Sequence, residues 1–227
     1  MKMVDAIIAA AGNSERFCGD KLFLDVEGKP VIFYTIRAFE NSFADRIIIS
    51  SRKEKMPYLE AVCSLWKDMY SWAKEIVLCE GGPTRAESVE NALRISSADI
   101  VSIHDGARPL VSPDLINRSI EDCVKYGSSV AALNPVDAVK RAGEHIENIE
   151  NIPKEEIYLA QTPQTFPGEK IISAYGQFFS ESENASPADD CEVFGKYYPV
   201  HFTEGKRANI KITYQSDLEF LLKMIRK

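Results

Sequence analysis

The chain has 227 residues, 45% of them apolar, and a formal net charge of −7, so it can bury a core of its own in one large or two small domains. The acidic balance argues against a general affinity for nucleic acid or for an anionic membrane surface. The five cysteines are odd in number, widely spaced and form no C-x-x-C pair. This pattern favours reduced thiols over disulfides or a zinc site and predicts a cytoplasmic protein. The apolar run before Gly12 is too short for a signal-peptide core or a membrane span, and we expect no later span.

Strand and helix patterns alternate along the chain, which predicts an α/β sheet with crossover helices. The predicted strands are residues 4–8, 47–50, 75–79, 100–103, 129–133, 157–160 and 199–203, with a further extended segment at 209–213. The predicted helices are residues 31–40, 58–67, 84–95, 113–126, 169–179 and 216 to the C-terminus. The last helix is expected to start at a capping box of Ser216 and Glu219. Residues 161–167, which contain two prolines, are expected to form a rigid turn.

The first strand runs directly into a loop of small residues, 9–21, that leaves the main chain accessible. Backbone N–H groups in such a loop can approach an anion closely, and the cations Arg16 and Lys21 follow soon after. The pattern is compatible with a polyphosphate cradle and equally with a tight turn that carries two solvated cations. Neither familiar phosphate fingerprint fits, because G-x-x-x-x-G-K-[ST] fails at Phe17 and G-x-G-x-x-G fails at Ser14.

The third strand ends in a pair of glycines, Gly81 and Gly82, ahead of a helix whose first turn carries Arg85 and Ser88. Close approach of a ligand to the backbone would explain the glycines. Taken by itself, the segment favours a well-capped helix, because it contains a T-x-x-E capping box.

The fourth strand ends in residues 104–109, which place an acid and a base where open parallel sheets bind their ligands. Asp105 is a candidate ligand for a divalent metal bound to phosphates, since carboxylate oxygens suit magnesium. The alternative is that Asp105 and Arg108 form a turn-capping pair. Further along the chain, Asp189 and Asp190 are explained by capping of a helix N-terminus.

Residues 134–156 break the alternation of strands and helices, with many charges and only short alternating pieces. A hairpin that projects from the sheet fits them better than a crossover helix, and such arms often exchange contacts between subunits. Residues 180–188 are polar, which predicts a surface loop, with a lid as the alternative. We expect a single domain over residues 1–227 with this β-arm.

Six segments, in this order, resemble the 2-C-methyl-D-erythritol 4-phosphate cytidylyltransferase family over nearly the whole chain. They are residues 10–12 with Arg16 and Lys21, then residues 81–88, 104–109, 135–141, 160–166 and 209–211. The resemblance implies a three-layer, Rossmann-like nucleotidyltransferase fold of the α/β class, with a mostly parallel sheet and a projecting β-arm. It also implies a homodimer made through the arm, magnesium as cofactor, and transfer from CTP to a polyol phosphate with release of pyrophosphate.

The resemblance further implies roles for individual residues. Arg16 and Lys21 would stabilise the transition state, while Lys211, together with Lys154 reaching over from the other subunit's arm, would hold the acceptor phosphate. Asp105 would bind metal or polyol, and Arg108 would lie on the polyol side. The residues expected around the nucleotide are Ala10, Ala11, Gly12, Asn13, Gly81, Gly82, Arg85 and Ser88.

Some positions depart from the usual pattern of this family. Lys154 replaces an arginine, which keeps the charge and loses the bidentate geometry. Ala138 replaces a polyol-binding threonine in the arm, and Asp20 stands before Lys21 where proline is common. The departures touch the acceptor side more than the triphosphate side. Two alternatives therefore stay open: a sister cytidylyltransferase that acts on ribitol 5-phosphate, and a nucleotide-binding protein without catalysis.

Overall fold

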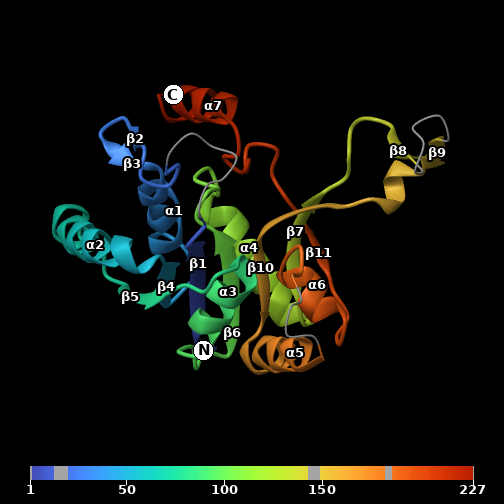
Figure 1. The fold of residues 1–227 in the computed structure, drawn as a ribbon, viewed down its shortest axis with the longest axis horizontal. Helices are drawn as coiled ribbons and strands as arrows, with labels where there is room; N and C mark the ends of the chain where they lie inside the picture. Colours follow the sequence, from blue (N-terminus) through green and yellow to red (C-terminus); the bar gives the residue numbers. More distant parts are fainter. Residues whose placement is uncertain (1, 13–19, 143–148, 182–185, 227) are drawn as a thin grey trace.

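The computed structural model describes residues 2–12, 20–142, 149–181 and 186–226, which are drawn in colour in Figure 1. The predicted site residues Asn13 and Arg16 lie outside these ranges, as does Cys18. Most of the polar loop predicted at 180–188 also falls outside them or within the end of a helix. None of the described helices is long and apolar enough to cross a membrane.

The centre of the described structure is a seven-stranded sheet with the strand order β11-β7-β10-β6-β1-β4-β5. Its strands are β1 (Val4–Ala10), β4 (Arg46–Ser51), β5 (Glu75–Glu80), β6 (Ile100–Asp105), β7 (Ser129–Leu133), β10 (Leu159–Pro167) and β11 (Phe202–Glu204). Strand β1 pairs in parallel with β4 and β6, β4 pairs with β5, and β7 pairs with β11, whereas β10 runs antiparallel between β6 and β7. The prediction of a mostly parallel α/β sheet is confirmed.

Helices cover both faces of this sheet and complete three layers (Figure 1). One face carries α1 (Val31–Glu40), α2 (Met56–Tyr70) and α4 (Pro113–Tyr126), and the other carries α3 (Arg85–Leu93), α5 (Gly168–Glu181) and α6 (Asp190–Gly195). Successive strand side chains point to opposite faces. Accordingly, Ile8 of β1 packs in one buried cluster with Ile36 of α1, while its neighbour Ile7 packs in the other with Val89 of α3.

The arm that the sequence predicts is present as a hairpin. Strand β8 (Val139–Ala142) pairs antiparallel with β9 (Ile149–Ile152), followed by the short 3₁₀ helix η2 (Lys154–Glu156). Figure 1 shows this arm projecting from the sheet beyond β7 and β11. Helix α7 (Gln215–Ile225) packs near the small hairpin of β2 (Asp25–Val26) and β3 (Lys29–Pro30) around Leu221 and Val26. That residues 1–227 form a single domain remains a prediction.

The rigid turn predicted for residues 161–167 is wrong, because the segment belongs to strand β10. Residues Gln164 to Pro167 pair with Ile103 to Ile100 of β6. The strand accommodates Pro163, which has no N–H to give to a neighbour, through a shift of register against β7 between Ala160 and Gln164. Pro163 therefore marks an irregularity inside β10, and the strand continues to Pro167.

Two predictions near the C-terminus also need correction. Residues 209–213 form no strand, although the N–H of Ile212 donates to the carbonyl of Ala107 at 2.8 Å. Helix α7 begins at Gln215, and its first turn is closed by Asp217, whose carboxylate accepts from the backbone N–H groups of Thr213 and Tyr214, each at 2.8 Å. The expected capping box starting at Ser216 is therefore wrong, because the neighbouring acid takes the capping role.

Candidate functional site

A cavity of about 570 Å³ opens at the carboxyl ends of β1 and β6, the edge at which open parallel sheets bind ligands. Its volume falls in the usual range of small-molecule sites. The described residues that line it are Ala9, Ala11, Gly12, Lys21, Leu22, Gly82, Pro83, Thr84, Arg85, Ser88, Asp105, Ala107, Ser186 and Lys211. Most of the predicted site residues therefore meet in one cavity, although they come from four distant stretches of the chain.

The remaining predicted residues take other positions. Ala10, Gly81 and Arg108 lie next to lining residues without lining the cavity themselves. Lys154 lies on the arm, where its Nζ is 3.4 Å from the carbonyl of Val136. The structure thus does not bring Lys154 to the cavity of its own chain.

One wall of the cavity is the turn between β5 and α3. The hydroxyl of Ser88 accepts from the N–H of Gly82 at 3.0 Å and donates to the carbonyl of Thr84 at 2.7 Å. The predicted capping box is present, since Thr84 and Glu87 satisfy each other's backbone N–H groups. The capped helix and the ligand-facing turn are therefore the same structure.

Gly81 brings this turn against the loop that follows β1. A Cβ atom at Gly81 would lie 2.4 Å from the Cβ of Ala11 and 2.9 Å from the hydroxyl of Ser88. Only a residue without a side chain fits such a contact, so the backbone of Gly81 packs directly against the methyl group of Ala11. This packing supplies a structural reason for the small residues of both motifs.

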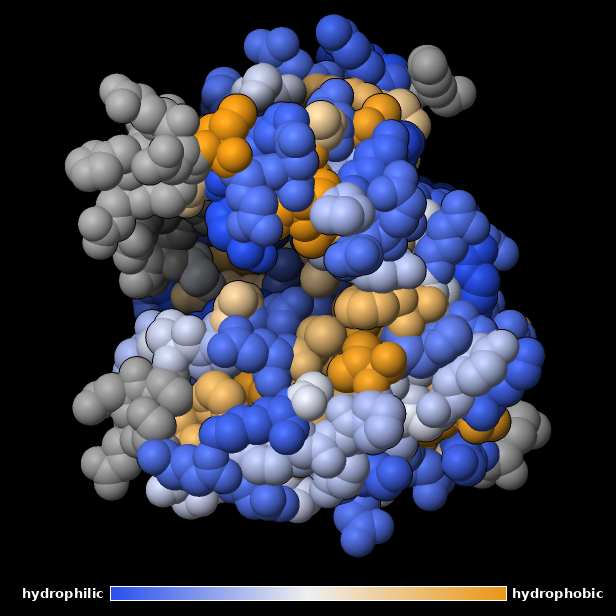
Figure 2. Space-filling model, turned by 90° about the vertical axis from the view of Figure 1, so that its right-hand side faces the viewer, coloured by the Kyte–Doolittle hydropathy of each residue, from blue (hydrophilic) through white to orange (hydrophobic). Residues whose placement is uncertain are grey.

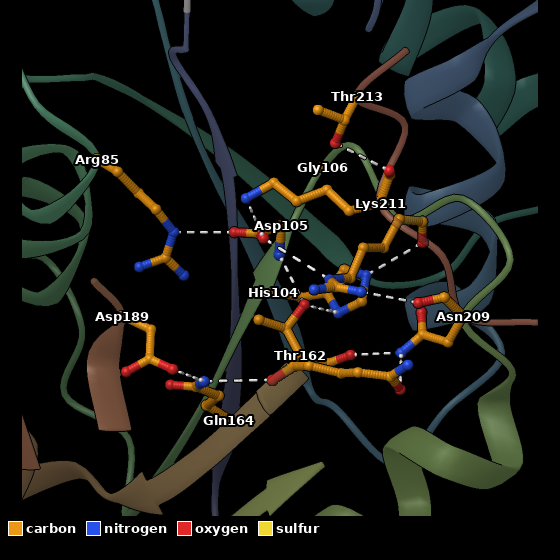
Figure 3. A network of polar contacts seen from close by, with 12 residues as sticks. Arg85, His104, Asp105, Gly106, Thr162, Gln164, Asp189, Asn209, Lys211 and Thr213 are labelled. Atoms are coloured by element: carbon orange, nitrogen blue, oxygen red, sulfur yellow. Dashed lines mark hydrogen bonds and ion pairs between the residues drawn. The ribbon is translucent and has the colours of Figure 1, made fainter. Parts of the chain in front are cut away.

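The carboxylate of Asp105 stands at the centre of the polar network in Figure 3. Arg85 reaches it from α3 with its Nε 2.8 Å from Oδ1, and Lys211 approaches from the opposite side with its Nζ 2.8 Å from Oδ2. The Nε of Arg108 lies 3.7 Å from the same Oδ2. Burial alone would raise the pKa of Asp105, but the three cations hold it well below its usual range. Asp105 is therefore an anion that organises three cations, and the turn-capping pair with Arg108 is only one part of its surroundings.

Arg85 is shared between two carboxylates, which the sequence alone did not suggest. Besides Asp105, its guanidinium contacts Asp190 of α6 in a bidentate pair, at 3.1 and 2.7 Å. The side chain of Asp190 is fully buried and also accepts from the hydroxyl of Tyr175 at 2.6 Å. Burial would lower the pKa of Arg85, but the two carboxylates raise it well above its ordinary value.

The two acids at the start of α6 have different roles. Asp189 caps the helix as predicted, since its Oδ1 accepts from the N–H of Glu192 at 2.9 Å, and its Oδ2 accepts from the amide of Gln164 at 2.8 Å. For Asp190, the interpretation as a cap alone is wrong, because its carboxylate faces inward to Arg85. Two adjacent acids at a helix start were the only sequence signal, since a cap needs one.

His104, expected as a base beside the acid, is a buried structural residue. Its ring lies between the hydroxyl of Thr162, 2.9 Å from Nδ1, and the carbonyl of Arg108, 3.2 Å from Nε2. A carbonyl only accepts, so Nε2 carries the proton and Nδ1 accepts from Thr162, whose hydroxyl in turn accepts from the N–H of Asp105 at 3.1 Å. Burial lowers the pKa of His104 to about 3. The neutral ring therefore fixes the backbone under Asp105 and does not exchange protons with the cavity.

The segment that carries Lys211 is fastened to this same network. The side-chain amide of Asn209 donates to the carbonyl of Thr162 at 2.7 Å, and the backbone carbonyl of Asn209 accepts from the guanidinium of Arg108 at 2.8 Å. Asn209 is fully buried. Sequence reasoning used Asn209 only as part of a motif, whereas the structure gives it the task of directing Lys211 towards Asp105.

The described residues do not form a metal cage. Among them, no group of three or more His, Cys, Asp or Glu side chains could hold a metal ion, and both oxygens of Asp105 face cations. Magnesium usually binds through one or two carboxylates together with substrate phosphates. The site therefore suits a magnesium ion carried by the phosphates of a nucleotide better than an ion held by the protein alone, and Asp105 would bind such an ion through an oxygen released by Arg85 or Lys211.

Comparison with known proteins identifies the same family throughout. The model of the family described as 2-C-methyl-D-erythritol 4-phosphate cytidylyltransferase matches residues 4–226. A curated relative of that name from Clostridium botulinum is 34% identical, over 96% of this chain and 95% of its own. Among solved structures, 4-diphosphocytidyl-2C-methyl-D-erythritol synthase from Anaerococcus prevotii is 25% identical, with a TM-score of 0.85 over 100% of this chain and 99% of its own. The Thermus thermophilus 2-C-methyl-D-erythritol 4-phosphate cytidylyltransferase is 28% identical, with a TM-score of 0.79 over 99% of this chain and 100% of its own.

Proposed function

The chain belongs to the 2-C-methyl-D-erythritol 4-phosphate cytidylyltransferase family, and on this premise we propose that it makes 4-diphosphocytidyl-2-C-methyl-D-erythritol for isoprenoid biosynthesis. The substrates are CTP and 2-C-methyl-D-erythritol 4-phosphate, and the second product is pyrophosphate. The observation that supports this most is the cavity itself, in which Lys21, Lys211 and Arg85 meet backbone from two strand ends. Such a site suits a polyanionic substrate.

The reaction needs positioning and charge stabilisation more than it needs proton transfer. An oxygen of the acceptor phosphate attacks the α-phosphorus of CTP, the new P–O bond forms, and the bond to the β-phosphate breaks with its electrons leaving on pyrophosphate. Catalysis of this type depends mainly on alignment of the reactants and on cations around the crowded phosphorus. A neutral, buried His104 agrees with this, because no base is required at that position.

We assign the cations by their places in the cavity. Lys21, on the loop after β1, would stabilise the transition state together with Arg16, which lies outside the described residues. Lys211, with a side chain 39% exposed, would hold the acceptor phosphate. Arg85 would act mainly by bracing Asp105, because its guanidinium is already bound to two carboxylates.

We assign the cytosine end to the turn formed by Gly81, Gly82 and Ser88. The backbone of this turn packs against the loop after β1 with no room for a Cβ atom at Gly81. A narrow edge of main-chain groups can select a pyrimidine, since a larger purine would need more space. Arg108 would lie on the acceptor side, behind Asp105.

We further propose magnesium as the cofactor, bound largely by the triphosphate, with Asp105 as its protein ligand. When bound, the ion would neutralise charge on the phosphates and so ease the departure of pyrophosphate. Chelation with EDTA should abolish turnover, and readdition of magnesium should restore it.

We propose that the arm joins two copies of the chain into a dimer. Lys154 lies on the arm, outside the described lining of its own chain's cavity, which leaves it available to the cavity of a second copy. Apolar side chains are exposed on and beside the arm, among them Val136 at 56%, Ile149 at 62% and Leu159 at 54%. Figure 2 views the arm's side of the molecule, and apolar side chains are grouped near the middle of that face. Exposed apolar groups of this kind are typical of interaction surfaces.

For the compartment, we propose the cytoplasm, where thiols such as the buried Cys63 and Cys123 stay reduced.

A substrate panel tests the function directly. Purified protein with magnesium and CTP should release pyrophosphate when 2-C-methyl-D-erythritol 4-phosphate is added, and the cytidylylated product should appear in equal amount. ATP in place of CTP, and CTP without an acceptor, serve as controls and should give little release. Turnover with ribitol 5-phosphate alone would assign the chain to the sister activity, and CTP binding without turnover would favour the non-catalytic alternative.

A further inference from the structure

The turn that carries Lys21 is held by an ionic cluster that the proposed chemistry does not use. The carboxylate of Asp20 pairs with the guanidinium of Arg52 and with the Nζ of Lys55, the latter at 3.3 Å. Arg52 follows β4, and Lys55 ends the short 3₁₀ helix η1 (Lys53–Lys55) that leads into α2. The three side chains are only 21–32% exposed, so solvent screens these pairs less than it screens pairs on the open surface.

The residues after Lys21 are anchored as well. The N–H of Phe23 donates to the carbonyl of Asp20 at 3.0 Å, and the carbonyl of Leu22 accepts from the N–H of Ile32 at 3.0 Å. The ring of Phe23 lies under the Nζ of Lys55 at 4.8 Å. Leu22 is 4% exposed and lines the cavity beside Lys21. The turn is therefore fixed on one side by packing and on the other by the pairs of Asp20.

We propose that Asp20 is a positioning residue: through its ion pairs with Arg52 and Lys55 it fixes the position of the Lys21 backbone relative to the cavity. This inference rests on the proposed function. A proline, the residue expected at position 20 from the resemblance, would restrain the backbone through its ring. In this chain the ion pairs of Asp20 restrain the backbone instead. Pairing with two cations also neutralises a carboxylate that would otherwise repel a triphosphate next to Lys21.

A double-mutant cycle separates positioning from a plain effect of charge. Asp20→Asn should lower kcat by about tenfold and raise KM for CTP by less than about threefold, because Lys21 is displaced most critically for the transition state. Arg52→Gln should have a similar effect, and the double variant should be little worse than either single variant. The exchanged pair, Asp20→Arg with Arg52→Asp, should recover most of kcat. Multiplying effects in the double variant, or no recovery on exchange, would overturn the proposal.

A matched control comes from another arginine–carboxylate pair, Glu27 with Arg226, whose side chains are 42% and 67% exposed and approach to 2.6 Å. The same cycle with Glu27→Gln and Arg226→Gln should leave kcat and KM unchanged. Thermal unfolding of all variants shows whether any loss reflects folding, and the Asp20 and Arg52 variants should keep the unfolding temperature of the parent within about 2 °C.

A readout that needs no turnover keeps the proposed function separate. Lysines carrying ¹³C-methyl groups can be followed by NMR, and the Lys21 signal is identified by its loss in Lys21→Arg. CTP should shift this signal in the parent and in the exchanged pair, and shift it clearly less in Asp20→Asn. If the parent turns over no polyol phosphate but the signals behave in this way, the proposed function fails while the positioning role stands. Equal shifts in all variants would refute the positioning role by itself.

Discussion

Removal of the charge on Asp190 should destabilise the protein and weaken its activity together. In Asp190→Asn the shape and the hydrogen bond to Tyr175 can persist, but Arg85 loses one of its two counter-charges. Breaking a buried ion pair from one side typically costs about 3–5 kcal/mol. Because Arg85 keeps Asp105 and its side chain is 27% exposed, we expect a smaller loss of about 2–3 kcal/mol. For a domain of this size that corresponds to a fall in unfolding temperature of about 4–12 °C.

Calorimetry or circular dichroism measures this shift, and two further variants make it interpretable. Asp189→Asn is the matched control, since the neighbouring acid caps α6 and asparagine caps a helix equally well. This variant loses only the hydrogen bond that the second carboxylate oxygen accepts from the amide of Gln164, so its unfolding temperature should fall by less than that of Asp190→Asn, by about 2–4 °C for a loss of about 1 kcal/mol. The double variant Arg85→Met with Asp190→Asn should be more stable than Asp190→Asn alone, because no buried cation is left without its partner. Its turnover should stay low, since Asp105 has lost its brace.

Two results would contradict a stabilising ion pair between Arg85 and Asp190. A change of less than about 1 °C in Asp190→Asn would mean that solvent screens the pair and that its burial is irrelevant. A double variant as unstable as the sum of both single variants would mean that each side chain stabilises the fold independently, without an ionic interaction between them.

Three other predictions concern the network, the turn and the arm. His104 has a pKa of about 3 in the fold, below the usual 6.5 of an unfolded chain. Its stabilising effect is therefore complete above about pH 6.5 and lost as pH falls towards 3, at about 1.4 kcal/mol per pH unit. The free energy of unfolding, measured with urea at several pH values between 4 and 6, should depend less steeply on pH in His104→Gln, by about one proton. An unchanged pH dependence would contradict the neutral ring. Gly81→Ala should raise KM for CTP more than it lowers kcat, because the new Cβ would meet Ala11 at 2.4 Å. Unchanged kinetics would show that the turn or the loop after β1 can shift to make room for the methyl group. Deletion of residues 138–150 should give monomers with little activity by light scattering and pyrophosphate release, whereas a fully active monomer would exclude a shared site.

Signals that act within a few residues were sufficient to predict much of the fold and the backbone of the site. The capping box of Thr84 and Glu87 spans one helical turn, and the helix predicted over residues 113–126 is α4, which starts with Ser112 as its cap and Pro113 as its first residue. These residues interact with their own neighbours, so the sequence pattern contains the whole interaction.

Interactions between distant segments could not be obtained in this way. Asp190 and Arg85 are 105 positions apart, and no local rule distinguishes an acid that caps a helix from one that turns inward to a guanidinium. The continuation of β10 past Pro163 depends on pairing with β6, which overrides the turn preference of the segment. In both cases a contact with a distant segment determines the local structure, and a single sequence does not reveal that contact.

The charges of the site explain how an acidic chain can offer a local place for a polyanion. Arg85, Arg108 and Lys211 carry three positive charges against the two negative charges of Asp105 and Asp190. The two acids keep Arg85, whose side chain is 27% exposed, paired on both sides, so its desolvation is compensated within the protein. Lys211 is more exposed, at 39% of its side chain, and is the member of this cluster that an incoming phosphate can reach. Binding of the substrates would thus add negative charge where the cluster has an excess of positive charge, and the net charge of −7 over the whole chain would weaken this attraction only at long range, where salt screens it.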